Sequence, residues 1–453
     1  MPVRFSELDG ARVGVWGAGR ELRSFAQQLS RRLPGAQIGV AAFDTAPPED
    51  VRETLRAPAA QVLTTADDDV VAALSSCDVV VRSPGVSIHR PEMLALREAG
   101  VPVTTATSLW LSERGGAGVI GVTGTKGKST TAALAFHLAR AAGRTAQLAG
   151  NIGVPALDLL DEEPVEVTVL ELSSYQTADL ETGPEVALVT NLFKEHTDWH
   201  GSELAYRAEK LRILELPGVR VGVINARDER LIATGEEIAR GGVEVRCFGA
   251  PGGWDAVAGG VRLKGELVVA SPDLPLLGEH NALNLCAALS ALEALGVAPP
   301  LPASLDGFQP LSHRLETVAE REGVLWVNDS ISTTPESALA ALASFPAREV
   351  VLIGGGQDRG QDYAQLGRAL ADAGAGVIGV PSTGARLVAA AREAGAPSKR
   401  AVEAANMLEA TVIAGALARR GAVVLLSPAA PSYDNYRDFE QRGELFRELV
   451  EAR

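Results

Sequence analysis

The chain has 453 residues, of which 46% are hydrophobic and 22% charged, and its formal net charge is −15. This length exceeds what one hydrophobic core usually holds, so two to four domains are expected. The acidic balance argues against nucleic acid or an anionic membrane as the main partner, because both bind basic surfaces, but a phosphorylated small molecule needs only a local positive pocket.

The three cysteines, Cys77, Cys247 and Cys286, lie far apart and have neither metal-ligand nor redox spacing. A disulfide framework is therefore not expected, and a reducing compartment fits. The N-terminal residues lack the apolar core of a signal peptide, and no apolar run approaches the length of a membrane span. We expect a cytoplasmic protein without membrane insertion.

The first block, residues 1–115, alternates short apolar runs with longer helical stretches, which is typical of a parallel sheet with crossover helices. It opens with "RVGVWGAGR" at residues 12–20, a strand that runs into a glycine turn. Further strands are predicted at Ile38–Phe43 and Val79–Arg82.

The glycine turn after the first strand partly fits a dinucleotide fingerprint. Gly17 and Gly19 hold the first two glycine positions, whereas Leu22 holds the third. Asp44 follows the next predicted strand, where an acid that binds a ribose would lie. The pattern is compatible both with a diphosphate-bearing ligand and with a plain turn between a strand and a helix.

The second block, residues 116–309, begins with a predicted strand at residues 118–122. The glycine-rich segment "GVTGTKGKST" follows at residues 121–130, and a helix is predicted from Ser129. One face of that helix is apolar: Leu134, Leu138 and Ala141. Three further strands are predicted in this block: Val167–Glu171, Val186–Asn191 and Val221–Asn225.

The glycine-rich segment indicates a phosphate-binding loop. Gly124 and Gly127 allow a tight turn in which backbone N–H groups converge on phosphate oxygens at the start of a helix. Lys128 would supply a positive charge for the outer phosphates, and the Ser129 hydroxyl would bind Mg²⁺. Val122 stands where the usual pattern has its first glycine, and the alternative is a glycine-rich turn with a surface lysine.

Four titratable residues of the second block are candidates for function. Glu171 ends a predicted strand, where a carboxylate near a phosphate loop is a natural Mg²⁺ ligand. His196 lies just beyond the end of another strand and is either a ligand or structural. We interpret His137, within the first helix of the block, as structural, and Lys210, in a helical segment, would ordinarily be a solvated surface lysine.

The third block, residues 310–453, follows a proline-rich linker at residues 296–314 that looks like a domain boundary. Strands are predicted in it at 324–328, 349–353, 376–380 and 422–426. The sequence therefore predicts an α/β protein of three domains with the phosphate loop at the start of the middle one.

A series of motifs extends over nearly the whole chain. They are "GVTGTKGKST", "GNIG" at 150–153, "LELSSYQ" at 170–176, "TNLFKEHTDWH" at 190–200, "YRAEKLRI" at 206–213, "GEHNALNLCAA" at 278–288, "SHRLE" at 312–316, "NDSISTTP" at 328–335 and "LSPAAPSYDNYRDFEQRGELF" at 426–446. These motifs, and their order, resemble those of the Mur ligases, and most closely the members of that family that add glutamate.

The resemblance implies a fold and an activity. The fold would be a Rossmann-like domain at 1–115 that binds a UDP-sugar, a P-loop ATPase-type domain at 116–309 that binds ATP, and a Rossmann-like domain at 310–453 that binds the amino acid. The activity would be an ATP-dependent amide ligase that adds D-glutamate to UDP-N-acetylmuramoyl-L-alanine through an acyl phosphate, in peptidoglycan precursor synthesis. The cofactors would be two Mg²⁺ ions and a CO₂-derived carbamate on a lysine, and the protein would be a monomer.

The resemblance also implies roles for individual residues. Lys128, His196 and Lys210 would be catalytic, with Lys210 as the carbamylated lysine, and the Mg²⁺ ligands would be Ser129, Glu171, His196 and Lys210. ATP would be bound by Gly124, Thr125, Lys126, Gly127, Lys128, Ser129, Thr130, Asn281, Arg314 and Asp329. The UDP-sugar would be bound by Gly19, Arg20, Asp44, Gly85 and Asn151, and glutamate by Thr333, Arg359, Ser432 and Phe439.

Two positions depart from the D-glutamate-adding pattern. Ile331 and Arg359 stand where many such members have lysine, which leaves L-glutamate as an alternative substrate. Other readings are a folate–polyglutamate-type ligase, a P-loop nucleotide switch or kinase, and a dinucleotide-dependent oxidoreductase. A folate–polyglutamate-type ligase lacks a UDP-binding domain of this type. A nucleotide switch or kinase would leave the motifs after the phosphate loop without a role. The oxidoreductase hypothesis rests on the glycine turn at residues 17–22 alone.

Overall fold

The computed structural model describes residues 2–44, 61–64, 69–193, 197–276, 278–309, 312–345 and 347–453, except for the side chains of Thr197, Asp198 and Glu336. The chain divides into two compact units, Met1–Phe308 and Gln309–Arg453. Within the described residues, the first unit contains three β-sheets and the second contains one.

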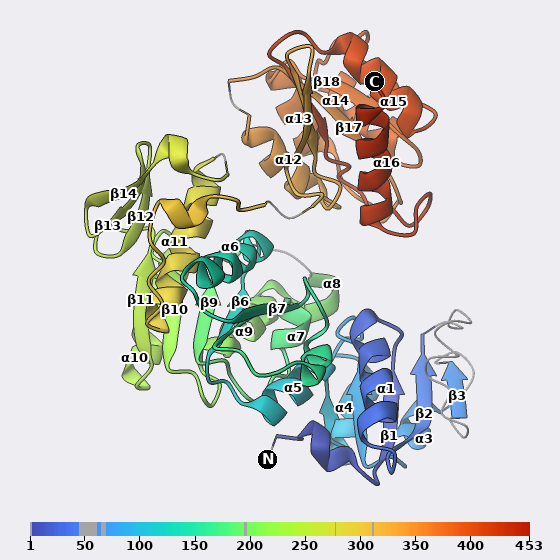
Figure 1. The fold of residues 1–453 in the computed structure, drawn as a ribbon. Coiled ribbons are helices and arrows are strands. Elements are labelled where there is room, and N and C mark those ends of the chain that lie inside the picture. The colour runs from blue at the N-terminus through green and yellow to red at the C-terminus, as the bar shows by residue number, and fades with distance from the viewer. Residues whose placement is uncertain are drawn as a thin grey trace. The chain divides into compact units, whose positions relative to one another are not determined.

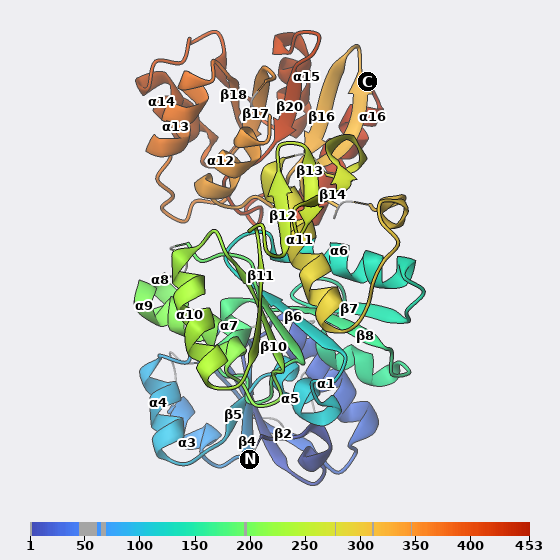
Figure 2. The same cartoon turned by 90° about the vertical axis from the view of Figure 1, so that its left-hand side faces the viewer.

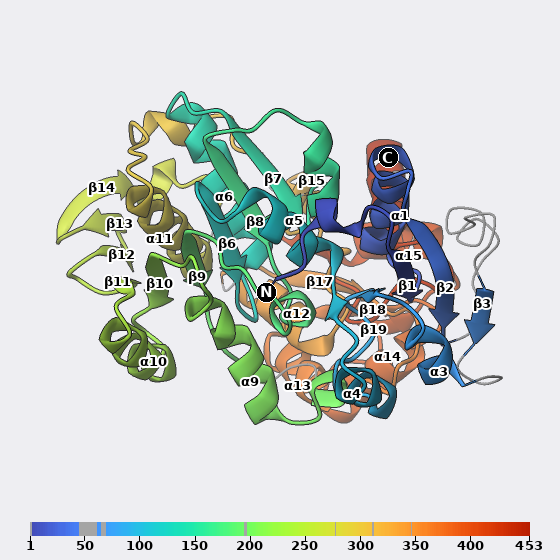
Figure 3. The same ribbon diagram turned by 90° about the horizontal axis from the view of Figure 1, so that it is seen from below.

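The first sheet is parallel and is covered on both faces. Its elements are η1 (Phe5–Leu8, a 3-10 helix), β1 (Arg12–Trp16), α1 (Arg20–Arg32), β2 (Gln37–Phe43), β3 (Gln61–Thr64), α3 (Val70–Leu74), β4 (Val79–Arg82), α4 (Pro91–Glu98), β5 (Val103–Thr104) and α5 (Ala106–Arg114). The strand order is β3-β2-β1-β4-β5. Val13 and Val15 pack with α1 and α5, whereas Trp16 packs with α3 and α4, because side chains alternate along a strand. Figure 3 shows α1 and α3 on opposite sides of β1 and β2.

The central sheet is also parallel, with the order β11-β10-β9-β6-β8-β7. Its elements are β6 (Val119–Thr123), α6 (Lys128–Ala141), β7 (Ala146–Gly150), η2 (Ala156–Asp161), β8 (Val167–Glu171), α7 (Ser174–Thr177), β9 (Val186–Val189), α8 (Thr197–His200), α9 (Glu203–Leu211), η3 (Arg212–Leu214), β10 (Val221–Asn225), α10 (Glu229–Arg240), β11 (Glu244–Phe248), α11 (Glu279–Ala294) and η5 (Ala303–Leu305). Helices α6 and α11 lie side by side against the sheet (Figure 1). Leu109 of α5, Leu157 of η2 and Leu170 of β8 belong to one apolar core that joins the first and central sheets.

A small antiparallel sheet follows the central one in sequence and was not predicted. It consists of β12 (Trp254–Val257), β13 (Gly260–Leu263) and β14 (Glu266–Ala270), followed by η4 (Ser271–Asp273), and it packs beside α11 (Figure 2). Lys264 and Gly265 connect β13 to β14 with φ angles of 51° and 90°. A two-residue hairpin turn of this kind needs positive φ at both positions.

The second unit is one sheet between two layers of helices. Its elements are β15 (Glu316–Arg321), β16 (Val324–Asn328), α12 (Pro335–Ala343), β17 (Val350–Gly354), α13 (Ala364–Asp372), β18 (Gly376–Gly379), α14 (Gly384–Glu393), β19 (Ala401–Glu403), α15 (Met407–Leu417), β20 (Val423–Leu426) and α16 (Phe439–Glu451). The order is β15-β16-β20-β17-β18-β19, and only the edge strand β15 is antiparallel in the described sheet. Leu352 packs with α12–α14, and Val351 packs with α15 and α16 on the other face. Figure 1 shows these helices around the sheet.

The strands predicted from the sequence are confirmed, as is the α/β class with several parallel sheets. The largest shift is at Val186–Asn191, where the strand ends at Val189. On α6, Leu134 and Leu138 are buried as expected, but Ala141 is exposed because it lies in the last turn, beyond the packed face. Of the described helices, none combines the length and apolar character that crossing a membrane requires.

Candidate active site

The glycine-rich segment connects β6 to α6, and two of its glycines are required by space as well as by conformation. Gly124 and Gly127 have φ angles of 134° and 84°. A Cβ atom on Gly124 would lie 2.0 Å from Thr190 Oγ1, and one on Gly127 would lie 2.2 Å from Asn284 Oδ1. The first N–H groups of α6 have no partner within the helix, so this tight turn leaves donors and a positive helix end for an anion.

The segment is held by residues at the end of β9 and on α9. The Lys126 N–H donates to Asn191 Oδ1 at 2.8 Å, and Thr190 Oγ1 donates to the Lys126 carbonyl at 2.7 Å. Thr125 Oγ1 and the Tyr206 hydroxyl are 2.8 Å apart. These side chains fix the loop before any ligand binds, which is what an anion-binding cradle needs. The sequence had not indicated Thr190, Asn191 or Tyr206 for this task.

Lys128 and its neighbours occupy the first turn of α6. The Lys128 ammonium donates to the Thr125 carbonyl at 2.9 Å, so the side chain folds back over the loop. Ser129 and Thr130 are buried in the same turn. The positive charge and the hydroxyl groups therefore lie where the loop would hold a phosphate chain.

Glu171 brings a buried carboxylate to the strand next to this loop. It ends β8, and its backbone pairs with Val122 of β6. Asn151 Nδ2 donates to Glu171 Oε1 at 2.8 Å, whereas Oε2 is buried and has no hydrogen-bond partner among the described residues. A buried carboxylate oxygen with an open coordination position fits a hard cation such as Mg²⁺.

Lys210 is buried, with 2% of its surface exposed, so the interpretation as a solvated helix lysine was wrong. Its helix α9 packs with α7 and α8. The Lys210 Nζ atom lies 5.0 Å from the centre of the Tyr206 ring, one helical turn earlier. Burial of an ammonium group is unfavourable unless its charge is compensated or removed. His196, the other expected ligand, lies outside the described residues.

Asn281 lies at the start of α11, close to the first turns of α6. Asn284 Nδ2 donates to Asn281 Oδ1 at 3.2 Å, and Thr131 Oγ1 on α6 donates to Asn284 Oδ1 at 3.4 Å. The structure thus links the residue expected to hold adenine to the helix that begins at the phosphate loop.

Three of the residues expected to bind a UDP-sugar, Gly19, Arg20 and Asn151, meet at the start of α1. The Arg20 guanidinium donates to the carbonyls of Gly150, Asn151 and Gly153 at 2.7, 3.1 and 3.0 Å. Gly19 is the N-cap residue of α1 and directly precedes Arg20. Because Asn151 also donates to Glu171, the 150–153 loop connects the start of α1 to the carboxylate of Glu171.

The other two such residues follow β2 and β4 of the first sheet. Asp44 forms an ion pair with Arg90 at 2.6 Å. The Gly85 carbonyl accepts a hydrogen bond from Trp199 Nε1 at 3.0 Å. Arg90 is a cation at this edge that the sequence did not suggest.

In the second unit, Asp329 is a buried carboxylate just after β16. The Leu315 N–H donates to it at 3.2 Å and Ser427 Oγ at 2.8 Å. Burial raises the pKa of Asp329 to about 6, although hydrogen bonds from Ser332 and Ser427 and the charge of Arg314 act in the opposite direction. Arg314 and Asp329, which were expected to act on the nucleotide, are thus electrostatically coupled within this unit.

The residues expected to bind glutamate come from separate loops of the second unit. Thr333 is half-buried between β16 and α12, and Ser432 is buried in the loop before α16. Phe439 begins α16, and its carbonyl accepts a hydrogen bond from Ser330 Oγ at 2.8 Å. Ser330 therefore ties the loop after β16 to the start of α16.

Arg359 is exposed in the loop that follows β17. Its Nε donates to Gln357 Oε1 at 3.2 Å, and its guanidinium lies 5.8 Å from the centre of the Tyr433 ring. Tyr433 follows Ser432, so Arg359 lies beside one of the other residues expected to bind glutamate.

Family models and relatives identify the kind of protein. Residues 122–292 match the Mur ligase middle domain, and residues 313–430 match the Mur ligase glutamate ligase domain. A protein of Xanthomonas axonopodis pv. citri named UDP-N-acetylmuramoyl-L-alanine–L-glutamate ligase is 41% identical over 99% of this chain and 97% of its own length. The chain belongs to the Mur ligase family. Relatives with the same name in Micromonospora sp. and Salinispora tropica are 42% and 40% identical, over 99% of this chain and 98% and 99% of theirs.

Solved structures of Mur ligases share the fold. The UDP-N-acetylmuramate–alanine ligase of Thermotoga maritima matches with a TM-score of 0.61 and 18% identity, over 98% of this chain and 99% of that one. The MurF ligase of the same organism, determined in complex with ADP, matches with a TM-score of 0.59 and 18% identity, over 98% and 97%.

One residue that sequence reasoning missed lies among the loops expected to bind glutamate in this Mur ligase. Arg442 of α16 is buried and donates to Ser330 Oγ at 3.0 Å, the Ser330 carbonyl at 2.8 Å and the Ala430 carbonyl at 3.1 Å. Burial lowers its pKa to about 10. The arginine within "FEQRGELF" was the available signal, but a helical arginine is ordinarily solvated, and only the fold shows that this one is covered.

The histidine that was interpreted as structural has a structural environment. His137 Nε2 makes a 2.9 Å hydrogen bond to the Ser304 carbonyl, and its ring packs edge-on against Phe308. It therefore holds the C-terminal part of the first unit against α6.

Proposed function

We propose that this chain is an ATP-dependent acid–amino-acid ligase that joins glutamate to UDP-N-acetylmuramoyl-L-alanine in peptidoglycan precursor synthesis. The observation that carries the proposal is the buried carboxylate of Glu171, of which one oxygen has no hydrogen-bond partner among the described residues. It lies on the strand next to a loop that requires glycine at positions 124 and 127. That pairing suits a nucleotide with its metal ion. The names of relatives that match over 99% of the chain supply the reaction class.

The proposal divides the chain into three functional parts and predicts a monomer in the cytoplasm. Residues 1–115 would bind the UDP-sugar, residues 116–309 ATP, and residues 310–453 glutamate. The assigned residues are those expected from the resemblance: for the UDP-sugar Gly19, Arg20, Asp44, Gly85 and Asn151; for ATP the 124–130 loop, Asn281, Arg314 and Asp329; for glutamate Thr333, Arg359, Ser432 and Phe439.

The chemistry would proceed in two steps. The substrate carboxylate attacks the γ-phosphorus of ATP, the bond to the β-phosphate oxygen breaks, and an acyl phosphate and ADP form. The glutamate amine then attacks the acyl carbon, loses a proton, and phosphate leaves with its bonding electrons. Lys128 and the N–H groups of the loop neutralise charge as a carboxylate approaches a polyanion.

Glu171 and Ser129 would hold one Mg²⁺, and His196 and Lys210 a second. Bound Mg²⁺ supplies charge neutralisation for the transferring phosphoryl group. For Lys210, the neutral amine would attack CO₂ and lose a proton, which gives an anionic carbamate. The carbamate would carry the negative charge that a Mg²⁺ ligand needs and that the ammonium group of an unmodified lysine lacks.

The amino acid is proposed to be L-glutamate. The resemblance had led us to expect D-glutamate, but the relatives that match over 99% of this chain are named for the L enantiomer. The departures at Ile331 and Arg359 lie in the part of the chain assigned to glutamate. A planar guanidinium forms a directed two-bond fork with a carboxylate, whereas lysine offers a point charge.

The proposal is tested by phosphate release from ATP with each substrate omitted in turn, followed by kcat/KM for D- and L-glutamate. We expect release only when UDP-N-acetylmuramoyl-L-alanine and glutamate are both present, with a clear preference for L-glutamate. Equal release without the sugar nucleotide would refute the ligase function. A preference for D-glutamate would refute the assignment of L-glutamate as the substrate and leave the ligase function standing.

A further inference from the structure

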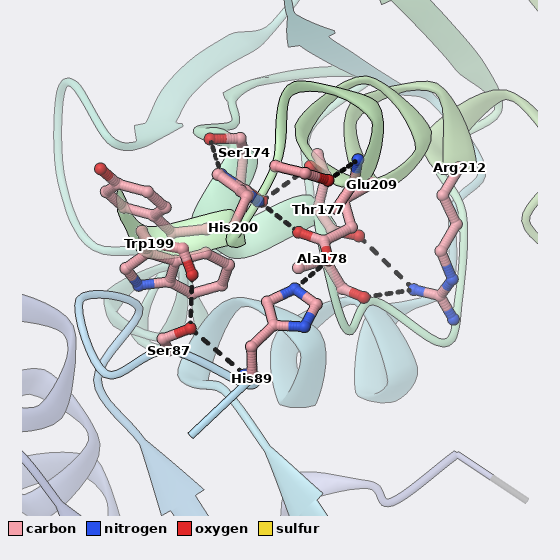
Figure 4. A network of polar contacts seen from close by, with 12 residues as sticks. Ser87, His89, Ser174, Thr177, Ala178, Trp199, His200, Glu209 and Arg212 are labelled. Atoms are coloured by element: carbon pink, nitrogen blue, oxygen red, sulfur yellow. Dashed lines mark hydrogen bonds and ion pairs between the residues drawn. The ribbon is translucent and has the colours of Figure 1, made fainter. Parts of the chain in front are cut away.

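Helix α9 carries the buried Lys210 and contacts the phosphate loop through Tyr206. It makes a second set of side-chain contacts, through Glu209, to which no role has been assigned. One residue before the lysine, Glu209 contacts two imidazoles, one through each carboxylate oxygen. His200 Nδ1 bonds to Oε2, and His89 Nε2 lies 2.5 Å from Oε1 (Figure 4). The His200 side chain is fully buried and that of Glu209 is 12% exposed. We refer to His89, His200 and Glu209 as the histidine–glutamate cluster.

The cluster is connected to the part of the chain assigned to the UDP-sugar. His89 lies in the loop after β4, which also contains Gly85. Ser87 Oγ in this loop donates to the Trp199 carbonyl at 2.6 Å, and Trp199 Nε1 returns a hydrogen bond to the Gly85 carbonyl at 3.0 Å. The loop is thus attached to α8 and α9 through three of its residues.

The cluster is also connected to the strand that ends at Glu171. His200 Nε2 lies 3.0 Å from Ser174 Oγ, at the start of α7, three residues after Glu171 (Figure 4). If His200 carries its proton on Nδ1, this side chain donates to Glu209 and accepts from Ser174. His89 then donates from Nε2 to the other carboxylate oxygen of Glu209, so each of these polar contacts has a donor and an acceptor.

The consequence for Lys210 follows from helix geometry. Tyr206 and Lys210 are one turn apart on α9 and share a face, and the Tyr206 hydroxyl contacts Thr125 of the phosphate loop. Glu209, three residues after Tyr206, lies next to it on the helix surface, and its partner His200 packs edge-on against the Tyr206 ring with 5.2 Å between the ring centres. The contacts of Tyr206 and Glu209 therefore attach the turn that carries Lys210 both to the phosphate loop and, through His89, to the UDP-sugar loop.

We propose that Glu209 is a positioning residue that couples the Gly85–His89 loop to Lys210. Loss of the cluster would displace the lysine amine from the place where its carbamate forms and would loosen the loop assigned to the UDP-sugar. This inference rests on the proposed function, because it assumes that Lys210 is carbamylated and that Gly85 contacts the sugar nucleotide.

The test uses Glu209→Ala and Glu209→Gln in the full chain, with Glu203→Gln as the matched control. Glu203 is on the same helix and pairs with Arg207 at its surface. Ligation is measured in CO₂-depleted buffer against added bicarbonate, together with the KM for UDP-N-acetylmuramoyl-L-alanine and for ATP. In Glu209→Ala we expect the half-saturating bicarbonate concentration and the KM for the sugar nucleotide to rise about 10- to 100-fold, with the KM for ATP unchanged. Glu209→Gln should lie between Glu209→Ala and wild type, because an amide keeps one of the two contacts.

A second variant separates the two halves of the cluster. His89→Gln should raise the KM for the sugar nucleotide more than the bicarbonate requirement, because His200 still holds Glu209. Combined with Glu209→Ala it should add little, since the two residues act through one contact. His137→Gln, which removes a structural imidazole elsewhere in the same unit, serves as the control.

Three results would overturn the inference. One is a Glu209→Ala protein with a lowered melting temperature but wild-type bicarbonate dependence and KM values, which would leave a purely structural role. Another is stoichiometric Zn²⁺ in the purified protein that disappears in His200→Gln, which would make the cluster a metal site. The third is a wild-type enzyme that ligates glutamate without any need for bicarbonate. In that case the ligase function stands, but Glu209 has no carbamate to position.

Discussion

Replacing Asp329 with asparagine should stabilise the chain near neutral pH while it removes ligase activity. Asp329 is buried after β16, and burial is the largest influence on its pKa, which rises to about 6. At pH 7 the folded protein therefore holds a carboxylate whose ionisation costs more free energy than it does in the unfolded chain. Asparagine has nearly the same shape and no charge, and the Ser427 hydroxyl can reverse its hydrogen bond to accept from the amide.

The magnitude follows from the two pKa values. The pKa is 3.8 in the reference state and about 6 in the folded state, and each unit corresponds to about 1.4 kcal/mol, so the charged form costs ~3 kcal/mol of stability at pH 7. The sign is set by proton binding. Between pH 4 and 6 the folded state binds the proton more tightly, so this stability is present below about pH 4 and is lost as pH rises through about 6. About half of the loss, ~1.4 kcal/mol, falls between pH 5 and pH 8.

The assay is urea denaturation of the full chain at pH 5 and pH 8, in wild type, Asp329→Asn and the control Asp372→Asn. Asp372 is exposed at the end of α13 in the same unit. The free energy of unfolding of Asp329→Asn relative to wild type should rise by ~1.4 kcal/mol from pH 5 to pH 8. A weakened hydrogen bond would lower this relative stability by ~1 kcal/mol at both pH values and would leave the rise unchanged. Asp372→Asn should show no such change.

An Asp329→Asn variant that is destabilised equally at both pH values would refute the reasoning, because the carboxylate would then be stabilised by its hydrogen bonds at neutral pH. Retention of wild-type turnover would separately refute the assignment of Asp329 to the nucleotide. The two readouts are independent, so the electrostatic argument and the functional assignment can fail one at a time.

Three further predictions concern the proposed reaction. Glu171→Gln should lower kcat by at least ~100-fold at saturating Mg²⁺ while the protein stays folded by circular dichroism, because a metal-directed charge is removed, and near wild-type turnover would contradict the metal assignment. Lys210→Ala should be nearly inactive and should regain activity with added short carboxylates that replace the carbamate; normal turnover would show that the lysine has no catalytic role. Arg359→Lys should raise the KM for glutamate about tenfold and leave that for ATP unchanged, since two directed bonds become one, and an unchanged glutamate KM would remove Arg359 from the pocket.

The parallel sheets were predictable because each strand is a short apolar run of its own, bounded by turn residues. The phosphate loop was predictable because its glycines, lysine and hydroxyl residues lie within one short segment of the chain. The structure adds that Thr190 leaves no room for a Cβ atom on Gly124, and Asn284 leaves none on Gly127. The antiparallel sheet at 254–270 was missed, although "AGGVRLKGELVV" contains alternating apolar residues and a Lys-Gly turn. Its three strands have only four or five residues each, too few for periodicity alone to separate them from loops.

Burial of individual charges could not be predicted, because it depends on which distant segments cover a helix. From the sequence, Lys210 is interpreted as a surface residue of α9, but in the fold it is buried, and α9 packs with α7 and α8. Arg442 reads in the same way on α16, and the loops at Ser330 and Ala430 cover it. Arg442 bonds to Ser330, which is 112 residues away in the chain, so no local pattern encodes its burial.

The buried charges have a common explanation in the proposed reaction. Glu171 and Asp329 are carboxylates and Arg442 is a guanidinium, and each is desolvated without an opposite charge in direct contact among the described residues. A fold selected for stability alone would replace such groups with apolar ones of similar volume. Hydrogen bonds offset part of this cost, as does the charge of Arg314 at Asp329, and ligands of opposite charge would offset more of it. A metal-bound nucleotide and a dicarboxylic amino acid would be such ligands. The same residues that lower the stability of the empty protein are therefore those expected to contribute most to binding, since a charge that is already desolvated and fixed loses little further on meeting its ligand.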